Sequence, residues 1–353
     1  MNNNIYINGR FLTQKITGVQ RYSFELIKVL SNNDKIDIIV LVPKNSILKE
    51  NYDFDFSIKK IGYNIGHAWE QFDLPLYLYK KNNPLFISFT NTSPIFYRNK
   101  ISTIHDLSVY ENNDWFSFQF RILYKILLPL IIYTSKNILT VSQFSKNEII
   151  KKFKIDNEKI HVAYNGISFS RKKVEQFKKV KSKANYILYV GSISERKNLN
   201  SLLEAFNRLH NTELLLKIVG CSFIHIKSKK IKYNKNVEFL KNVSNDELVE
   251  LYSNAKLLVF PSFYEGFGIP PLEAMFCECP VIASNIPVIK ELYGDSVLYI
   301  NPFNIDSIKD KIELLLIDDK LRRKIIEKSL KKIKKFSWIK SGAKVLDVIK
   351  NNT

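Results

Sequence analysis

Short runs of apolar residues alternate with longer amphipathic stretches along the first half of the chain. The runs are rich in Ile, Val, Tyr and Phe and end at polar turns, which is typical of buried strands. We predict strands over residues 4–8, 36–42, 85–89, 101–106, 137–142 and 160–166. The intervening patterns predict helices over 18–31, 69–82, 115–136 and 145–153. The last of these begins with a capping box, in which Ser145 and Glu148 stand three positions apart.

The alternation stops at a basic, polar stretch and then resumes. Residues 169–184 carry no strand signal, and we predict a linker there. Beyond it we predict strands over 186–191, 214–220, 236–240, 256–261, 280–284 and 297–301. The predicted helices cover 199–210, 244–254, 271–278, 305–335 and 338–350. Ser244 and Glu247 form a second capping box.

Strand–helix alternation of this kind predicts parallel sheets covered by helices. A chain of 353 residues is long for one core and suits two domains. We therefore predict an α/β protein with two Rossmann-like, doubly wound domains that face a central cleft. The N-terminal domain covers 1–168, the linker 169–184 and the C-terminal domain 185–337. In such sheets ligands bind beyond the carboxyl ends of the strands.

The composition argues against several classes of protein. The formal net charge is +20, spread along the chain, with no zinc-finger spacing or other nucleic-acid signature. The charge reflects either a lysine-rich composition or attraction to an anionic partner, such as a membrane surface or a phosphorylated substrate. The three cysteines, Cys221, Cys277 and Cys279, make neither a disulfide framework nor a zinc site. They favour a reduced, cytoplasmic protein.

No membrane-spanning segment is expected. The N-terminus lacks the basic and then apolar pattern of a signal peptide, and the longest apolar run, 122–133, is about half of a bilayer span. The stretch 115–136 mixes Trp, Arg and Lys with apolar residues, as interfacial helices do. It is either a buried helix packed on the first sheet or a peripheral contact with the inner face of the plasma membrane.

Two glutamates surround a glycine- and proline-rich turn in FYEGFGIPPLEAM, residues 263–275. The turn follows a buried strand, and Pro271 suits the first turn of a helix. Glu273 is then expected in that first turn, with Glu265 in the loop before it. Carboxylates accept hydrogen bonds from sugar hydroxyls, and amides at a helix N-terminus hold phosphate. The alternative is that Glu273 only stabilises the helix end.

Other polar residues also follow predicted strands. Arg196 and Lys197 precede a helix, where cations are unfavourable unless an anion binds them; otherwise they are solvated surface charges. Gly18 lies in the loop before the first helix, which is weak evidence for an anion site. The pair His105–Asp106 ends a strand and is as readily structural as catalytic. The D-x-D pattern at 53–55 lies in a polar loop, so we expect no metal.

Together these stretches resemble retaining glycosyltransferase family 4, which has the two-domain GT-B architecture and includes bacterial enzymes of polysaccharide assembly. The resemblance covers nearly the whole chain, from INGRFLTQKITGVQRY through TIHDLSVY and VGSISERKNL to LLVFPSFYEGFGIPPLEAM. It implies a metal-independent hexosyltransferase, with mannose among the sugars, that uses a nucleotide diphosphate sugar and no cofactor. The implied acceptor is a saccharide or lipid-linked saccharide of O-antigen, lipopolysaccharide or capsule. It also implies that helix 338–353 packs back on the first domain.

The resemblance further implies roles for individual residues. Glu273 would bind the ribose, and Glu265 with the Gly266, Phe267 and Gly268 segment would hold the transferred sugar. The remaining implied roles are diphosphate binding by Arg196, Lys197 and Gly18, a base contact near Val243, a sugar contact from His105, and acceptor contacts from Asp106 and Trp69. The chain departs from many relatives in having Ser192 where they have arginine. A sugar-nucleotide epimerase and a non-catalytic binding component of a polysaccharide complex remain alternative functions.

Overall fold

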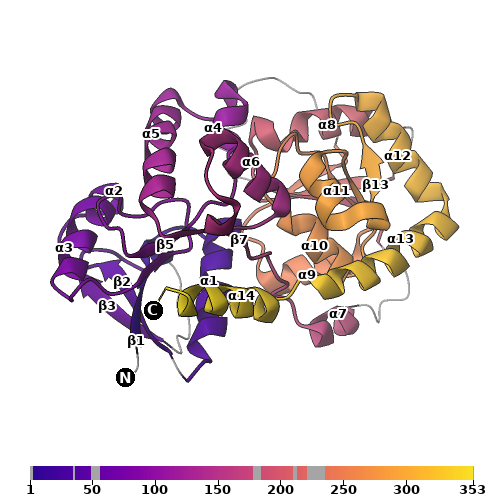
Figure 1. Ribbon diagram of the computed structural model, residues 1–353. Coiled ribbons are helices and arrows are strands. Elements are labelled where there is room, and N and C mark those ends of the chain that lie inside the picture. The colour runs from indigo at the N-terminus through magenta and orange to yellow at the C-terminus, as the bar shows by residue number, and fades with distance from the viewer. Residues whose placement is uncertain are drawn as a thin grey trace. The chain divides into compact units, whose positions relative to one another are not determined.

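The computed structural model describes residues 3–34, 36–48, 56–177, 184–209, 213–220 and 235–352. The chain forms two units, one made of 1–166 with 337–353 and the other of 167–336 (Figure 1). The D-x-D pattern at 53–55 and Cys221 lie outside the described residues. Cys277 and Cys279 are buried free thiols, as expected of structural cysteines.

Unit 1 is built on a seven-stranded sheet in the order β3-β2-β1-β4-β5-β6-β7, in which each neighbouring pair is parallel. Its strands are β1 Asn3–Asn8, β2 Ile36–Pro43, β3 Ser57–Ile61, β4 Phe86–Ser88, β5 Lys100–Thr103, β6 Asn137–Thr140 and β7 Ile160–Val162. Strand β3 was not predicted because its sequence, SIKKI, lacks a continuous apolar run and most of its side chains are not buried. Such a pattern is typical of a strand at the edge of a sheet.

The helices of unit 1 follow its strands as a doubly wound fold requires. They are α1 Gly18–Ser31, α2 Gly66–Ala68, α3 Leu74–Tyr79, α4 Ser108–Glu111, α5 Phe118–Thr134, α6 Gln143–Phe153 and α14 Trp338–Lys350. The predicted helix over 69–82 is instead interrupted, because Trp69–Asp73 forms a π-helical turn between α2 and α3. The prediction of a cap at Ser145 is wrong: α6 begins earlier, and the Ser142 side chain accepts from the Ser145 amide.

Unit 2 repeats the architecture on a six-stranded sheet in the order β10-β9-β8-β11-β12-β13. Its strands are β8 Tyr186–Val190, β9 Leu215–Val219, β10 Val237–Leu240, β11 Leu257–Phe260, β12 Val281–Ser284 and β13 Leu298–Ile300. Its helices are α7 Arg171–Phe177, α8 Leu199–Asn207, α9 Asn245–Asn254, α10 Ile269–Phe276, α11 Pro287–Tyr293, α12 Ile305–Ile317 and α13 Asp319–Lys332. The Rossmann-like fold predicted for both halves is confirmed.

Three predicted features of unit 2 differ in how well they match the structure. The capping box of Ser244 and Glu247 is present at the start of α9. The expected helix 305–335 divides at Asp318, whose side chain accepts from the Leu321 amide and starts α13. The expected linker carries α7, which packs on α9 within unit 2.

In both sheets the strand order reverses next to the first strand. In unit 1 the reversal separates β1 from β4, and in unit 2 it separates β8 from β11. Helices on the two sides of such a point run to opposite faces of the sheet, so the loops after these strands diverge and leave a crevice where ligands bind. The candidate sites are therefore expected at the ends of β1 and β4 and at the ends of β8 and β11.

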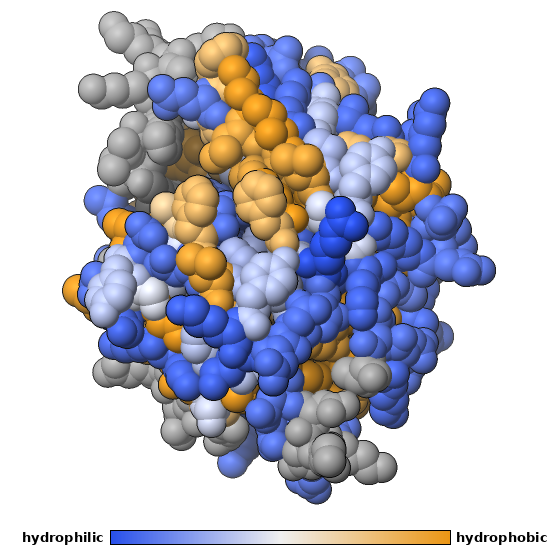
Figure 2. All heavy atoms as spheres, turned by 60° about the vertical axis from the view of Figure 1, so that its left-hand side comes forward, coloured by the Kyte–Doolittle hydropathy of each residue, from blue (hydrophilic) through white to orange (hydrophobic). Residues whose placement is uncertain are grey.

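Helix α5 has two different faces. Leu127, Leu128, Ile131 and Ile132 are buried in a core cluster with β6 and α6. The opposite face exposes apolar side chains, and Figure 2 shows apolar residues gathered on this side of the molecule. The exposed set is Phe118, Phe120, Ile122, Leu123, Ile126, Leu130 and Tyr133. Among the described residues, no helix is long and apolar enough to cross a membrane.

The last helix completes unit 1. Helix α14 packs on α1, where the rings of Trp338 and Tyr22 meet edge to face at 5.9 Å. The Ser341 hydroxyl donates to the Tyr164 carbonyl oxygen at 2.5 Å. Gly342 faces Val29 of α1, and a Cβ atom at this glycine would overlap the valine side chain. Close contact between the two helices thus depends on Gly342.

We expect Gly342→Val to lower the free energy of unfolding by about 1–3 kcal/mol, because the new side chain forces α14 away from α1. Ala343→Val is the matched control. Ala343 is the next residue of α14 and is exposed, so only the lower helix propensity of valine, about 0.5 kcal/mol, should matter there. Urea unfolding of both variants tests this, and equal effects would contradict the packing role of Gly342.

Candidate active site

The two cationic residues predicted to belong to the site, Arg196 and Lys197, lie in the segment that joins β8 to α8. Glu195–Lys197 forms a 3-10 turn, and Asn198 follows in the left-handed conformation at φ 55°. The buried Asn198 amide donates to the carbonyl oxygens of Pro261 and Pro302 at 3.1 and 2.8 Å. This anchors the cationic segment to the loop after β11. Asparagine suits the position because it tolerates positive φ.

Glu265 is held by both predicted cations. Lys197 Nζ lies 2.6 Å from Glu265 Oε1, and Arg196 Nη1 lies 3.1 Å from Glu265 Oε2. The same guanidinium nitrogen donates to the Tyr264 carbonyl oxygen at 2.7 Å. The Phe263 amide in turn donates to the Arg196 carbonyl oxygen at 2.9 Å. The two loops at the reversal of the sheet are therefore joined by both backbone and side-chain contacts.

The cluster of Arg196, Lys197 and Glu265 is largely removed from water. Burial alone would raise the pKa of Glu265, but Lys197 and then Arg196 outweigh it, and the pKa lies below its usual value. The carboxylate is thus ionised at neutral pH. Two cations and one anion leave a net charge of +1, in a place where water screens charge poorly. This arrangement suits an anionic ligand, and each carboxylate oxygen keeps a second lone pair for a hydroxyl donor.

Glu273 lies on α10, two residues further into the helix than predicted. The helix begins at Ile269 rather than at Pro271, so the first turn contains no acid and Glu273 is the fifth residue. Its carboxylate is buried and accepts from the Tyr252 hydroxyl at 3.0 Å. The earlier start follows from Gly268, whose φ of 88° lets the loop turn directly into the helix.

Tyr293 is close enough to both glutamates to feel their charge, and it binds the turn between them. Its hydroxyl donates to the Gly268 carbonyl oxygen at 2.5 Å. Burial, followed by the nearby charges of Glu265 and Glu273, raises the pKa of Tyr293 well above its ordinary value. The phenol therefore keeps its proton and fixes the turn between the two carboxylates. Neither Tyr252 nor Tyr293 was predicted, because both come from helices whose contacts here are long-range.

Phe267 and Val243 occupy different parts of unit 2. The buried Phe267 ring meets Phe336 edge to face at 5.6 Å, so this side chain supports the turn from within. Val243 is half-buried and directly precedes Ser244, the N-cap of α9, on the loop after β10. The structure thus brings together Arg196, Lys197 and Glu265, with Glu273 one helical turn away from Gly268. It places Val243 on a different loop.

His105 of unit 1 lies beyond the end of β5, which is shorter than predicted. The ring is buried and Nε2 is 2.9 Å from the Phe89 carbonyl oxygen. Since a carbonyl oxygen only accepts, Nε2 carries the proton and Nδ1 of the neutral ring is an acceptor. Burial lowers the pKa of His105, against the opposing effects of Phe89 and Asp106. The backbone is also fixed, since the His105 amide donates to Asn91 and its carbonyl accepts from Ser145.

The other predicted residues of unit 1 have structural contacts. Asp106 accepts from the Ser108 amide at the start of α4. Gly18 is the first residue of α1 rather than a loop residue, and Thr17 is its N-cap. Trp69 is fully buried, and its indole N–H donates to the Ile61 carbonyl oxygen. The Trp69 side chain therefore stabilises the core of unit 1 and offers no surface for an acceptor.

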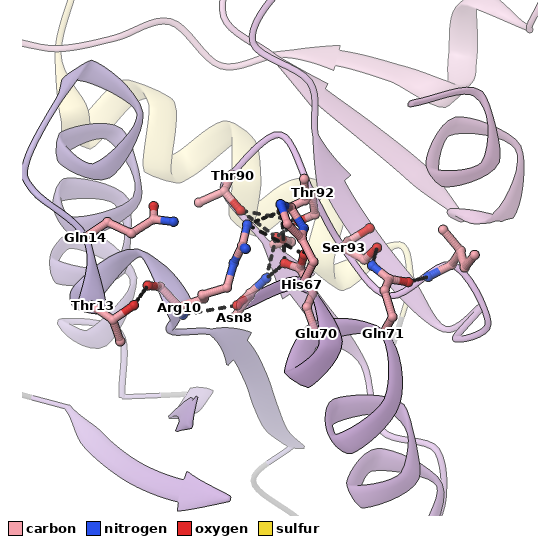
Figure 3. Close-up of polar contacts among 12 residues, drawn as sticks. Asn8, Arg10, Thr13, Gln14, His67, Glu70, Gln71, Thr90, Thr92 and Ser93 are labelled. Atoms are coloured by element: carbon pink, nitrogen blue, oxygen red, sulfur yellow. Dashed lines mark hydrogen bonds and ion pairs between the residues drawn. The ribbon is translucent and has the colours of Figure 1, made fainter. Parts of the chain in front are cut away.

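A polar cluster that was not predicted lies at the reversal of the unit 1 sheet (Figure 3). Glu70 is fully buried there, and its Oε1 accepts from Asn8 Nδ2 at 2.5 Å and Thr92 Oγ1 at 3.0 Å. Arg10 donates to the Thr92 hydroxyl at 2.8 Å. Burial opposes ionisation, but Arg10 and the hydrogen-bond donors lower the pKa of Glu70. The family resemblance assigns the segments GHAWEQ, 66–71, and TNTSP, 90–94, to the acceptor side, but no motif indicates that they form a buried cluster with Asn8 and Arg10.

Comparison with known proteins identifies the chain. Residues 16–171 match the family model described as Glycosyltransferase Family 4, and residues 170–332 match Glycosyl transferases group 1. The O-antigen chain mannosyltransferase RfbU of Salmonella typhimurium is 31% identical over 302 residues, which cover 81% of this chain and 83% of the relative. The chain is a family 4 glycosyltransferase. The family resemblance and the enzyme class predicted from sequence are confirmed.

Other similar proteins are consistent with assigning the chain to this family. O-antigen chain mannosyltransferase B of Escherichia coli is 27% identical and covers 92% of this chain and 93% of the relative. Among solved structures, WaaG, a glycosyltransferase involved in lipopolysaccharide biosynthesis, has a TM-score of 0.75 at 18% identity, covering 98% of this chain and 99% of that one. Sucrose-phosphate synthase from Thermosynechococcus elongatus has a TM-score of 0.76 at 16% identity, with 99% coverage of each chain. These structures establish the fold.

We expect the glycosyltransferase to lose stability as the pH falls through and below about 6.5, the ordinary pKa of histidine. His105 has a lowered pKa in the folded state, so the unfolded chain takes up this proton at a higher pH and is favoured as the pH falls. Urea unfolding of the wild type and His105→Gln, each referred to its own value near pH 8, measures the effect. The variant should lose less stability on acidification, and equal losses would contradict the neutral buried ring.

Proposed function

We propose that this glycosyltransferase moves a hexose-type sugar, mannose in the first instance, from a nucleotide diphosphate sugar to a saccharide or lipid-linked saccharide acceptor. The transfer retains the anomeric configuration, needs no metal ion, and belongs to the assembly of O-antigen or capsule. The observation that carries the proposal is the buried cluster of Arg196, Lys197 and Glu265 at the strand reversal of unit 2.

The net positive charge of this cluster supports a role in diphosphate departure. Negative charge grows on the leaving diphosphate, and fixed cations in a poorly screened site stabilise it without reorganisation. Glu265 keeps lone pairs that can accept from the hydroxyls of the transferred sugar, and Glu273 can accept from the ribose. His105 is the residue of unit 1 that we expect near the reacting carbon. The departing phosphate takes the proton of the acceptor.

The names of similar proteins support mannose as the transferred sugar and a polysaccharide as the product. Two are called O-antigen chain mannosyltransferases, and one, from Staphylococcus aureus, is a capsular polysaccharide biosynthesis glycosyltransferase that is 28% identical over 242 residues. A structure of Anabaena HepE, with a TM-score of 0.74 at 14% identity, is a complex with UDP-glucose. It supports a nucleotide sugar as donor for the present chain.

Two other functions make different predictions. A sugar-nucleotide epimerase would convert the donor in the absence of any acceptor, so product analysis with donor alone distinguishes it. A non-catalytic binding component would bind a nucleotide sugar tightly and turn over no acceptor. The family assignment favours transfer over both.

The exposed face of α5 supports a peripheral contact with a membrane surface. Its apolar side chains are joined by the cations Arg121 and Lys125 on the same helix, as in helices that lie in the membrane interface. The net charge of +20 favours an anionic lipid surface. We therefore infer that the enzyme works at the inner face of the plasma membrane, where a lipid-linked acceptor would be presented.

We expect Lys197→Ala and Glu273→Ala each to lose most of the transfer activity, by about 100-fold or more for Lys197, because a charge that stabilises the leaving group is removed. Lys320→Ala and Glu327→Ala, at exposed positions of α13, are the matched controls. Activity is measured as product formed from radiolabelled sugar nucleotide in excess EDTA. Normal rates in both site variants would refute the site, and loss of wild-type activity with EDTA would refute metal independence.

We expect Ile126→Asp to weaken vesicle binding roughly tenfold or more, since a charge replaces an exposed apolar side chain that would enter the interface. Ile317→Asp is the control, because Ile317 is also an exposed isoleucine but lies on α12 of unit 2. Co-sedimentation with phosphatidylglycerol-containing vesicles measures binding. Equal binding by both variants, or binding that is insensitive to anionic lipid, would argue against the contact.

A further inference from the structure

The short helix α10 is held from outside at its start, in its middle and at its end. It has eight residues, so its own hydrogen bonds stabilise it little and it depends on tertiary contacts. The Tyr293 hydroxyl donates to the carbonyl oxygen of its N-cap residue, and Arg171 donates to the carbonyl oxygen of its last residue. In the middle, Tyr252 contacts Glu273. The position of α10 is therefore set by contacts from other segments of unit 2.

The contact from Tyr252 acts directly on the carboxylate of Glu273. The hydroxyl donates to Glu273 Oε2 at 3.0 Å. Burial, followed by the charge of Glu273, raises the pKa of Tyr252 well above its ordinary value, so the phenol keeps its proton. Tyr252 is fully buried, whereas Glu273 is 6% exposed, so only the carboxylate of this pair reaches a ligand. The hydrogen bond fixes the direction in which the remaining lone pairs of the carboxylate point.

Tyr252 is itself held by the first residues of unit 2. The unit begins at residue 167, and the ring of Phe169 lies 6.2 Å from the ring of Tyr252, tilted by 50°. Helix α7 follows and packs on α9, the helix that carries Tyr252. Lys173 of α7 also forms an ion pair with Asp246 in the first turn of α9. The entering segment therefore supports the helix from which Tyr252 projects.

The same segment supports the end of α10. Arg171 Nη2 lies 2.5 Å from Glu278 Oε1, and the Arg171 guanidinium lies 5.6 Å from the centre of the Phe276 ring. Glu278 has a φ of 56°, which is unfavourable for a residue with a Cβ atom and persists only where its surroundings hold it. Arg171 thus holds both the last carbonyl of α10 and the turn that follows it.

We propose that Tyr252 is a positioning residue for the nucleotide sugar donor. Its hydroxyl orients the Glu273 carboxylate toward the ribose hydroxyls, and residues 169–173 hold Tyr252 and α10 in the places this requires. Tyr252 does not touch the donor, because its side chain is fully buried. The proposal deepens the proposed function and rests on it for ribose as the ligand of Glu273. It gives the segment that enters unit 2 an influence on donor affinity without a donor contact of its own.

The test compares nucleoside diphosphates with and without ribose hydroxyls. The probes are GDP and UDP, with the 2′,3′-dideoxy form of whichever binds the wild type more tightly, measured by isothermal titration calorimetry. We expect Tyr252→Phe to weaken binding of the ribose form about tenfold, since a hydrogen bond to a charged group is lost, and to leave binding of the dideoxy form unchanged. Equal weakening of both forms would mean a structural role alone and would overturn the proposal, as would unchanged affinity for both.

Tyr186→Phe is the matched control. Tyr186 is another buried tyrosine of unit 2, and its hydroxyl donates to the Leu251 carbonyl oxygen at 2.7 Å, one residue before Tyr252 on α9. The substitution removes a comparable contact to the same helix without touching Glu273, so affinity for the ribose form should not change. A loss as large as that of Tyr252→Phe would overturn the proposal.

Steady-state kinetics provide a second readout. Tyr252→Phe should raise the KM for the donor about tenfold and leave kcat unchanged, as expected when an interaction made equally in the ground and transition states is lost. A fall in kcat with an unchanged KM would contradict a role in donor positioning.

Phe169→Ala tests the entering segment and decides the matter if Tyr252→Phe fails to fold. It removes the ring that packs on Tyr252 and should weaken binding of the ribose form by about threefold, since it acts only through Tyr252. Binding of the dideoxy form should stay the same. Equal losses for the two forms would overturn the proposal.

Binding by the wild type separates this proposal from the proposed function. If only the role of Tyr252 is wrong, the wild type prefers the ribose form over the dideoxy form and Tyr252→Phe retains that preference. If the wild type binds both forms equally, Glu273 does not bind the ribose and the positioning role is overturned with it. If the function is wrong, the wild type binds neither GDP nor UDP and releases no nucleotide from a sugar nucleotide.

Discussion

An ionised carboxylate remains stable inside a protein only where cations and hydrogen-bond donors replace the water it has lost. Both units meet this constraint at the same point of their sheets, where the strand order reverses. Glu265 depends on Lys197 and Arg196 in unit 2, and Glu70 depends on Arg10, Asn8 and Thr92 in unit 1. The residues that compensate each carboxylate lie on segments that follow different strands. The same contacts that stabilise the charge therefore also hold these segments together.

The two clusters differ in a way that fits different ligands. In unit 2 both carboxylate oxygens already contact a cation and the net charge is positive, which favours a diphosphate. In unit 1 one cation, Arg10, faces the Glu70 carboxylate beside the neutral donors Asn8 and Thr92, so this pair carries no net charge and does not attract an anion. The two units share one architecture of sheet and covering helices. Their charge clusters differ because different residues follow the equivalent strands.

Local patterns predicted much of the fold, and their failures have physical causes. The capping box of Ser244 and Glu247 was predicted correctly, because both of its hydrogen bonds form within four consecutive residues. The same sequence pattern at Ser145 gave a wrong prediction, because Ser142 caps the helix three residues earlier. Periodicity could not locate the break at Asp318, since α12 and α13 are both amphipathic. Motifs predicted that Arg196, Lys197 and Glu265 share a site. The burial of Glu70 was not predicted, because no recognised motif connects it with its partner Asn8, which lies 62 positions away.

The chain passes between the units twice, at 166–167 and at 336–337. Unit 2 is consequently one uninterrupted stretch inserted into unit 1, while unit 1 is made of two separate pieces of chain. A single proteolytic cut at either crossing leaves the units covalently joined. Unit 2 is continuous in sequence, so a chimaera between relatives can replace it by exchanging a single segment. A fragment that ends at residue 166 would lack α14 and would expose the face of α1 that this helix covers.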